Sequence, residues 1–444
     1  MLTFRIKPVQ VNPCRFIIIA FAAIIGVPEH AAGQSAAYFP PSEGPWETVP
    51  HDSLGWCPEN TAALLEFAES TNTRALIILK DGRIALESYM NGFQQDSLWY
   101  WASAAKTVTA TLAGIAQQEG YLDIQQPVSH YLGTDWTDCT PEEEAQRTVF
   151  HQLTMSSGFN PAPWFWDCTD PECFSCFTEP GTSWHYHNGV YRRLIEVIEA
   201  AASTTRNIYT TQKIKDKIGM QGFWFDNLFI SRARDMARFG LLACNDFVWN
   251  GDSILTDIAY ADAMRNTALQ ANPAYGYLWW LNGKDHYLEP MVDQPQDGWI
   301  VPSAPADMYA GMGANDQRMY IAPSEGLVVI RMGDVAYEES MALSGFDDEL
   351  WQHIAELPCA GLSAEHSPQQ DIRLSVYPNP SSGFISIRDP EQFQGARIYT
   401  TAGKKVWAGS GRALAEQINL GAGVYIIEAY HREGGTQTAK IIVY

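Results

Sequence analysis

Two predicted β-hairpins lie far apart in this chain, and their positions constrain the fold more than any other feature. β-prone runs at 75–79 and 83–86 flank a Lys-Asp-Gly turn, and runs at 318–321 and 327–331 flank a Pro-Ser-Glu-Gly turn. Short turn sequences between two such runs are typical of hairpins.

Helical patterns fill the region between these hairpins. Apolar residues recur on one face of 103–119, and helical patterns recur at 190–202 and 232–242. Strands at both ends and helices in the middle favour an α+β fold whose N- and C-terminal strands share one antiparallel sheet. The helices predict a second, all-helical subdomain.

The amino-acid pattern of the chain changes near residue 361. Residues 361–371 are small and polar and predict a linker. Short β runs alternate with turns across 372–444, which predicts a small all-β module, a β-sandwich.

The N-terminus has the layout of a secretory signal peptide. Three basic residues (Arg5, Lys7 and Arg15) precede an apolar run at 16–27, and Ala31-Ala32-Gly33 supplies small residues. The apolar run is short for a bilayer span, so a membrane anchor is the weaker interpretation. We therefore expect 1–33 to be a signal peptide and 34–72 to be an irregular N-terminal extension.

Charge and cysteine content narrow the function classes. The chain has 51 acidic and 29 basic residues and a net charge of -22, which argues against nucleic acid as a partner. Seven cysteines follow the leader: Cys57, Cys139, Cys168, Cys173, Cys176, Cys244 and Cys359. An exported chain is expected to form disulfides, and the odd count leaves at least one thiol free. The C-x-x-C at 173–176 lacks a second ligand pair, so a disulfide is favoured over a metal site.

Ser103 and Lys106 form the S-x-x-K of this chain. On a helix, positions i and i+3 share a face, so the lysine amine can reach the serine hydroxyl. A base activates a hydroxyl for nucleophilic attack, and lysine serves as that base when burial lowers its pKa. The alternative is a surface Ser and Lys on an amphipathic helix.

A second motif, Tyr186-x-Asn188, follows a Pro-Gly turn and precedes a predicted helix. Tyr-x-Asn also occurs at 89–91 and 377–379, but without this turn-then-helix setting. Only the Tyr186 copy therefore predicts a functional site.

Five stretches in order resemble the serine β-lactamase, penicillin-binding-protein and esterase superfamily: 101–106, 151–158, 180–194, 231–240 and 275–280. The resemblance is greatest to the class C-like branch that includes esterases and 6-aminohexanoate-dimer hydrolase, and it assigns a hydrolase domain to 73–360. It implies that Ser103 is the acylated nucleophile, Lys106 its base and Tyr186 a proton shuttle. Asn188 would bind the substrate amide or carbonyl.

The family's Lys-Thr-Gly motif is replaced here by Tyr309-Ala310-Gly311. The resemblance places Tyr309 and Gly311 in the substrate site, and Met312 joins Ser103 as a backbone donor to the oxyanion. Without Lys and Thr, the groups that hold a penicillin carboxylate are missing. Hydrolysis of esters or linear amides needs no such clamp.

Aromatic residues and histidines crowd these motifs. The aromatic residues are Trp99, Tyr100, Trp101, Trp164, Trp166, Trp184, Trp279 and Trp280. They can line an acyl pocket, but a core role is favoured. His185 and His187 flank Tyr186, and a structural role is favoured over a catalytic one.

The C-terminal module resembles the type IX secretion sorting domain of Bacteroidetes. The matching stretches are 376–383, 396–403, 420–426 and 438–444. The resemblance implies export through type IX secretion machinery and release or cell-surface attachment. A carbohydrate-binding or adhesive sandwich is the alternative.

These observations predict a secreted serine hydrolase that cleaves small-molecule esters or amides through an acyl-Ser103 intermediate. The alternatives are a β-lactamase or D,D-peptidase, or an inactive member of the fold that serves as a binding module. The mechanism requires no metal or organic cofactor. Nucleic acid and a permanent membrane span are not expected.

Overall fold

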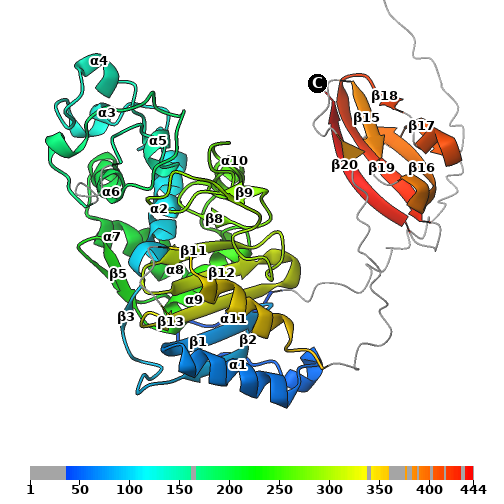
Figure 1. Cartoon of the computed structure of the whole chain (residues 1–444), viewed down its shortest axis with the longest axis horizontal. Helices are drawn as coiled ribbons and strands as arrows, with labels where there is room; N and C mark the ends of the chain where they lie inside the picture. Colours follow the sequence, from blue (N-terminus) through cyan, green and yellow to red (C-terminus); the bar gives the residue numbers. More distant parts are fainter. Residues whose placement is uncertain are drawn as a thin grey trace, which may run out of the picture. The chain divides into compact units, whose positions relative to one another are not determined.

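The computed structural model describes residues 37–161, 167–337, 342–359, 376–377, 383–387, 390–400, 404–414, 417–431 and 436–443. The expected signal peptide, the expected linker, Trp164 and Trp166 lie outside these residues. The chain forms two compact units that divide between Cys359 and Ala360 (Figure 1). Each unit is described by itself.

The first unit is built around a six-stranded sheet in the order β2-β1-β13-β12-β11-β8. These strands are β2 (Arg83–Tyr89), β1 (Thr73–Lys80), β13 (Leu327–Gly333), β12 (Gln317–Ala322), β11 (Tyr309–Gly313) and β8 (Trp280–Leu281). Every pairing is antiparallel, and Ile77 of β1 lies opposite Ile330 of β13. The prediction that N- and C-terminal strands share one antiparallel sheet is confirmed.

The β1–β2 hairpin follows from its turn residues. Lys80 pairs with Arg83, so Asp81 and Gly82 form a two-residue turn, and their φ angles are 49° and 82°. Positive φ at both positions is the geometry that Asp-Gly favours in hairpins. A Cβ on Gly82 would lie 1.8 Å from the carbonyl oxygen of Tyr38, so only glycine fits beneath the N-terminal segment.

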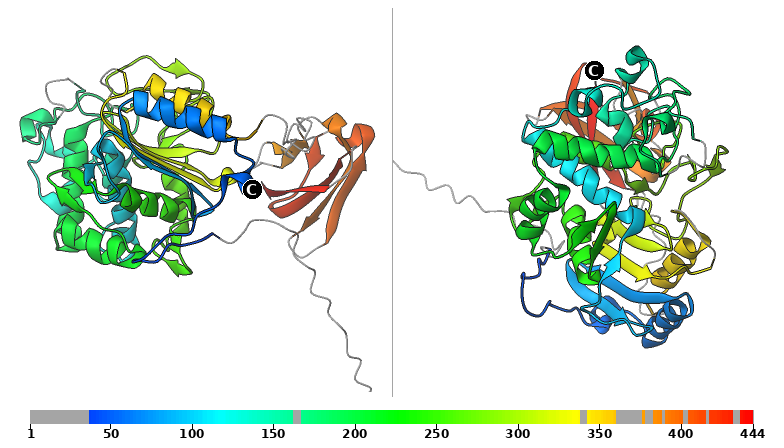
Figure 2. Two further views of the ribbon diagram at one scale, coloured as in Figure 1. Left: turned by 90° about the horizontal axis from the view of Figure 1, so that it is seen from below. Right: turned by 90° about the vertical axis from the view of Figure 1, so that its left-hand side faces the viewer.

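Helices cover both faces of the sheet (Figure 2). Helices α1 (Pro58–Ser70) and α11 (Gly345–Ala355) pack together on one face, and α9 (Ala233–Cys244) packs on β1, β12 and β13. The expectation that 34–72 is irregular is wrong for α1. Its buried positions Thr61, Leu64 and Ala68 follow helical spacing, and Pro58 starts the helix.

The all-helical region gathers around α2 (Lys106–Gln118) and α6 (Asn188–Ala202), which pack against each other (Figure 1). All residues of α2 from Lys106 to Ala116 are buried. The other helices of this region are α3 (Ser129–Leu132), α4 (Pro141–Glu144), α5 (Val149–Leu153), α7 (Arg206–Thr210), α8 (Asp216–Ile218) and α10 (Ile258–Met264). The helix predicted at 190–202 is confirmed as part of α6. The helix predicted at 232–242 is confirmed as α9, with Arg232 as the residue that caps its start.

Short helical turns and small sheets complete this unit. The turns are η1 (His51–Leu54), η2 (Ala102–Ala105), η4 (Pro171–Cys173), η5 (Thr211–Lys215) and η6 (Pro323–Glu325). The small sheets are β3 (Trp99–Tyr100) with β5 (Leu228–Ser231) and β4 (Phe223–Phe225), β6 (Val248–Trp249) with β7 (Asp252–Ser253), and β9 (His286–Tyr287) with β10 (Gln296–Asp297).

Three disulfides join Cys57 to Cys359, Cys139 to Cys176 and Cys168 to Cys173. Among the described residues, Cys244 is the free cysteine. The predicted disulfides and the odd thiol are confirmed. Cys173 and Cys176, the two cysteines of the C-x-x-C, therefore bond to different partners. The disulfide between Cys57 and Cys359 ties the N-terminal part of the unit to its C-terminal end.

The second unit holds two antiparallel sheets. One contains β14 (Val376–Tyr377), β15 (Phe384–Ile387) and β18 (Ile418–Asn419). The other contains β16 (Phe393–Thr400), β17 (Lys405–Ser410), β19 (Gly423–His431) and β20 (Thr436–Val443), with the turns η7 (Pro390–Gln392) and η8 (Gly411–Leu414) nearby. Ile385, Ile398 and Ile427 form part of a fully buried core of its own. The predicted β-sandwich is confirmed.

Candidate active site

Ser103 lies in η2, directly after β3 and before α2. The predicted helix over 103–119 therefore begins with a 3-10 turn, and α2 itself starts at Lys106. Trp101 anchors the turn because its indole N–H donates to Ser231 Oγ at 2.8 Å and its backbone N–H donates to Phe229 at 2.9 Å. Ala102 has a φ of 46°, an unfavourable value for a residue with a Cβ. The turn that presents Ser103 is thus held by tertiary contacts.

Lys106 meets Ser103 one turn later, as the S-x-x-K spacing predicts. Its Nζ donates to Ser103 Oγ at 2.8 Å and to Asn188 Oδ1 at 2.9 Å. The side chain is 4% exposed, and burial lowers the pKa of Lys106 from 10.5 to about 7, although Asp167 acts in the opposite direction. A large fraction of the amine is therefore neutral near neutral pH, which is the form that accepts a proton.

Two tyrosine rings enclose this amine. Lys106 Nζ lies 5.0 Å from the ring centroid of Tyr186 and 4.4 Å from that of Tyr191. Tyr186 also hydrogen-bonds with Ser103, and burial raises its pKa above the ordinary value. The hydroxyl of Tyr186 therefore stays protonated at neutral pH beside the serine. Tyr191 was missed by the sequence analysis, although it lies three residues after Asn188 and thus on the same face of α6.

His187 lies between Tyr186 and Asn188 in the sequence and holds both residues in position. Its Nδ1 accepts a hydrogen bond from Val190 N at 3.3 Å, which caps the start of α6. The ring stacks on Phe174 at 5.7 Å, and burial lowers the pKa of His187 to about 4. The histidine is therefore neutral at neutral pH and has the structural role that was favoured.

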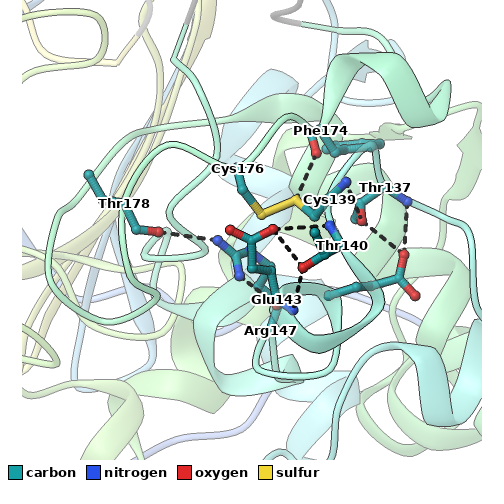
Figure 3. Close-up of a disulfide and its surroundings, with 9 residues drawn as sticks. Thr137, Cys139, Thr140, Glu143, Arg147, Phe174, Cys176 and Thr178 are labelled. Atoms are coloured by element: carbon teal, nitrogen blue, oxygen red, sulfur yellow. Dashed lines mark hydrogen bonds between the residues drawn. A yellow bond between two sulfur atoms is a disulfide. The ribbon is translucent and has the colours of Figure 1, made fainter.

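The loop before Tyr186 is fastened by a disulfide and an arginine (Figure 3). The disulfide between Cys139 and Cys176 joins this loop to the segment before α4. Arg147 donates to the carbonyl of Thr178 at 3.2 Å (Figure 3). The loop is therefore tied to the helical region at two neighbouring points.

Strand β11 closes the site opposite α2. A Cβ on Gly311 would lie 3.1 Å from the carbonyl oxygen of Ala104, and one on Gly313 would lie 2.9 Å from Ser103 N and 2.6 Å from Trp101 O. The two glycines therefore let the strand approach the serine turn closely. The sequence analysis did not single out Gly313, although it lies two residues after Gly311 and so on the same face.

The backbone of Met312 faces the open edge of β11. Asn282 N donates to the carbonyl of Met308 at 2.9 Å, and Ala310 pairs with Trp280 of β8. N–H and C=O groups of every second residue in an antiparallel strand face the same neighbour. The N–H of Met312 therefore points to the same side, beyond the last β8 pair and beside the serine turn.

Tyr309 lies on the same strand, but its side chain is engaged elsewhere. Its hydroxyl donates to the carbonyl of Ala243 at 2.7 Å, and the ring packs on Trp279 and Arg265. The structure thus brings Ser103, Lys106, Tyr186 and Asn188 together and sets Gly311 and Met312 beside them. It does not bring the Tyr309 hydroxyl to the serine.

The aromatic residues divide between core and site. Trp101 and Trp279 are fully buried in the core. Trp184 and Trp280 pack around Tyr186, with ring centroids 6.1 Å and 6.3 Å from it. Core packing therefore accounts for Trp101 and Trp279, whereas Trp184 and Trp280 form a wall beside Tyr186.

Comparison with known proteins agrees with this geometry. Residues 66–345 match the family model described as "Beta-lactamase", and this match spans more than half of the chain. Residues 375–444 match the family model of a secretion system C-terminal sorting domain. A sorting domain directs the chain to secretion or to attachment at the cell surface. Within the described residues, every helix is too short or too polar to cross a membrane.

Solved structures share the fold at low sequence identity. A protein assigned as a β-lactamase from Bacteroides dorei has a TM-score of 0.52 and 15% identity, and the match covers 67% of this chain and 98% of that one. A protein assigned as a 6-aminohexanoate-dimer hydrolase from Bacillus anthracis has a TM-score of 0.52 and 16% identity, with 73% and 91% covered. No curated protein matches the chain. The family match shows that this chain belongs to the β-lactamase family of serine hydrolases, with a secretion-system sorting domain at its C-terminus.

Proposed function

We propose that this protein hydrolyses esters or small linear amides through an acyl intermediate on Ser103. The observation that carries the proposal is the buried amine of Lys106, whose Nζ lies 2.8 Å from Ser103 Oγ and whose pKa burial lowers to about 7. A base whose pKa lies near the working pH is suited to remove the serine proton.

In the acylation step, neutral Lys106 accepts the proton of Ser103 as Oγ attacks the substrate carbonyl carbon. The resulting oxyanion accepts hydrogen bonds from the backbone N–H groups of Ser103 and Met312. The bond to the leaving group then breaks, and the proton passes from Lys106 to the leaving oxygen or nitrogen by way of Tyr186. The protonated Tyr186 hydroxyl beside Ser103 supports this assignment.

In the deacylation step, water attacks the acyl-Ser103 ester and loses a proton to the same Lys106–Tyr186 pair. The tetrahedral intermediate collapses, the acid product leaves, and Ser103 regains its proton. Asn188 accepts from Lys106 at 2.9 Å, which leaves its amide N–H groups as donors to the substrate carbonyl. No step requires a metal or an organic cofactor.

The composition of β11 supports an ester or linear amide over a penicillin. Tyr309, Ala310 and Gly311 offer no cation to hold a carboxylate, and Tyr309 directs its hydroxyl to Ala243. A fixed cationic donor such as a lysine or arginine strengthens the recognition of a carboxylate. The proposed site therefore uses Gly311 for close approach and makes no use of the Tyr309 hydroxyl.

The test uses the full chain and a fluorophosphonate probe, with the adduct located by peptide mass mapping. We expect labelling of Ser103, loss of labelling in Ser103→Ala, and parallel loss of p-nitrophenyl ester hydrolysis. Ser70→Ala is the matched control because Ser70 is exposed at the end of α1. Absence of both labelling and hydrolysis from the folded protein would refute the enzyme proposal and favour a binding module. Faster turnover of a chromogenic cephalosporin than of esters would favour a β-lactamase.

A further inference from the structure

The proposed mechanism gives the buried amine of Lys106 a positive charge when it takes the proton of Ser103. Burial disfavours a charged group unless a partner compensates it. Among the described residues, no carboxylate forms an ion pair with this amine, and its partners in contact are Ser103 Oγ, Asn188 Oδ1 and two tyrosine rings. The groups that touch the ammonium are therefore all uncharged.

The ring of Tyr191 is the closer of the two aromatic partners. An ammonium has three N–H donors, and two oxygen acceptors lie within 2.9 Å of Lys106 Nζ. The centroid of the Tyr191 ring lies 4.4 Å from the same atom, against 5.0 Å for Tyr186. A cation within about 6 Å of an aromatic centroid is attracted to the ring face, and exclusion of water strengthens this attraction. Tyr191 therefore supplies a favourable partner for the charged form of Lys106.

Tyr191 is held in place between α6 and α2. It is buried three residues after Asn188, and its hydroxyl shares a hydrogen bond of 3.1 Å with Thr109 Oγ1. Thr109 lies three residues after Lys106 and thus on the same face of α2. Burial raises the pKa of Tyr191 to about 12, so its hydroxyl stays protonated at neutral pH. The ring is therefore neutral, fixed at its far end, and unable to compete for the serine proton.

The other ionisable groups around the Lys106 amine come from three segments. Ser103 is in η2, Tyr186 precedes α6, and Asp167 precedes η4. Strand β11 adds no charged residue. Asp167 raises the pKa of Lys106, but its side chain is 59% exposed and lies 3.9 Å from Arg192, so solvent and the arginine both weaken its effect. The ring of Tyr191 is thus the buried contact that is free of a role in proton transfer.

We propose that Tyr191 is a positioning residue of the reaction, whose ring face holds the Lys106 amine against Ser103 and stabilises the ammonium that forms there. In that step the O–H bond of Ser103 breaks, its proton forms an N–H bond on Nζ, and Oγ uses the freed electron pair to attack the carbonyl carbon. The ring itself is not changed, and it acts through Lys106. The inference rests on the proposed function and adds a residue to its machinery.

The test keeps the shape of the ring and changes the charge of its face. Tyr191→Phe is the reference, and 4-fluorophenylalanine and 3,4,5-trifluorophenylalanine are then placed at position 191. Fluorine withdraws electron density from the ring face, which weakens the cation–π attraction stepwise. Because the protonated amine loses stabilisation, the pKa of Lys106 should fall, and the rising limb of kcat/KM against pH should move down by about one pH unit in the trifluorinated protein. A weaker base should also lower the plateau kcat about threefold.

Tyr260 of α10 is the matched control. It is buried, its hydroxyl donates to the carbonyl of Ala110 in α2 at 2.8 Å, and its ring packs on Tyr277. The same series at position 260 should leave the rising limb in place. The bond to Thr109 is absent from every member of the 191 series, so its loss does not affect the comparison. A limb that stays fixed in the 191 series, or that moves equally in both series, would overturn the inference.

A direct titration separates this inference from the proposed catalysis. The pKa of the Lys106 amine is measured by NMR in Ser103→Ala protein carrying lysine labelled with ¹³C at Cε, and Lys106→Met identifies the resonance. A pKa that falls along the fluorinated 191 series supports the role of Tyr191 even if no ester is hydrolysed. A constant pKa in a protein whose Ser103 form hydrolyses esters would overturn this inference and leave the hydrolase proposal intact.

Discussion

Lys106 Nζ lies 2.8 Å from Ser103 Oγ, and the lysine side chain is 4% exposed. Burial lowers the pKa of Lys106 to about 7, so its neutral, proton-accepting form becomes abundant as pH rises through that value. We expect kcat/KM for a neutral ester to rise with pH and level off above about 7. A pH–rate profile measures it, with ester hydrolysis in buffer alone as the control. A rising limb centred near the ordinary lysine pKa would contradict this assignment.

The burial of Lys106 also lowers the free energy of unfolding of the protein. Its pKa is lowered from 10.5 to about 7 on folding, so the unfolded state binds the proton more strongly between these values. The cost is full below pH 7 and fades as pH rises towards 10.5. We expect Lys106→Met to stabilise the fold by about 1–3 kcal/mol in mildly acidic buffer, with a smaller gain in alkaline buffer. Urea unfolding at several pH values measures this, and a pH-independent difference would contradict it.

Gly313 has no room for a side chain beside the nucleophile. A Cβ there would lie 2.6 Å from Trp101 O and 2.9 Å from Ser103 N. We expect Gly313→Ala to push β11 away from the serine turn and to lower kcat by at least about tenfold, the effect of losing an oxyanion donor. Gly345→Ala is the control, because nothing lies within 4 Å of its Cβ position. Unchanged kcat in Gly313→Ala would show that the strand does not contribute to the oxyanion site.

His187 caps α6 and sets the positions of Tyr186 and Asn188. We expect His187→Ala to destabilise the protein by about 1 kcal/mol through loss of the cap, and to reduce ester hydrolysis. His187→Asn should recover part of the stability, because asparagine is a good helix cap. Thermal unfolding and kcat/KM of both variants test this. Equal loss in the two variants would show that ring packing on Phe174, rather than the cap, is decisive.

The disulfide between Cys139 and Cys176 fastens the loop that leads to Tyr186. We expect the double variant Cys139→Ser/Cys176→Ser to lose stability by about 2–4 kcal/mol, with reduced ester turnover because Tyr186 is less well held. The comparison is Cys57→Ser/Cys359→Ser, which removes the disulfide at the ends of the unit. If both double variants lower turnover equally, the effect is one of global stability.

Several features could be predicted because they depend on neighbours in the chain. The β1–β2 hairpin follows from Asp81-Gly82, whose backbone tolerates positive φ. The meeting of Ser103 and Lys106 follows from a three-residue spacing. The helix after Tyr186-x-Asn188 follows from its apolar periodicity. Helix α1 was missed although its buried positions keep helical spacing, because the surrounding Pro, Ser and Glu residues obscured that pattern.

Other features depend on segments that are distant in the sequence. Sequence periodicity does not tell which cysteines pair, because Cys57 and Cys359 are 302 residues apart. It also does not place Tyr191 beneath the Lys106 amine or Gly313 against Ser103, since these contacts arise only when α6 and β11 pack against α2 and its serine turn.

The sequence by itself determined the order of strands and helices, the sorting module and the residues available for nucleophilic chemistry, because turn geometry and side-chain periodicity act over a few residues. Only the tertiary structure decided the burial that lowers the pKa of Lys106 and the direction of the Met312 N–H. A pKa depends on which distant atoms exclude water, and that is settled when the sheet and the helical region pack together.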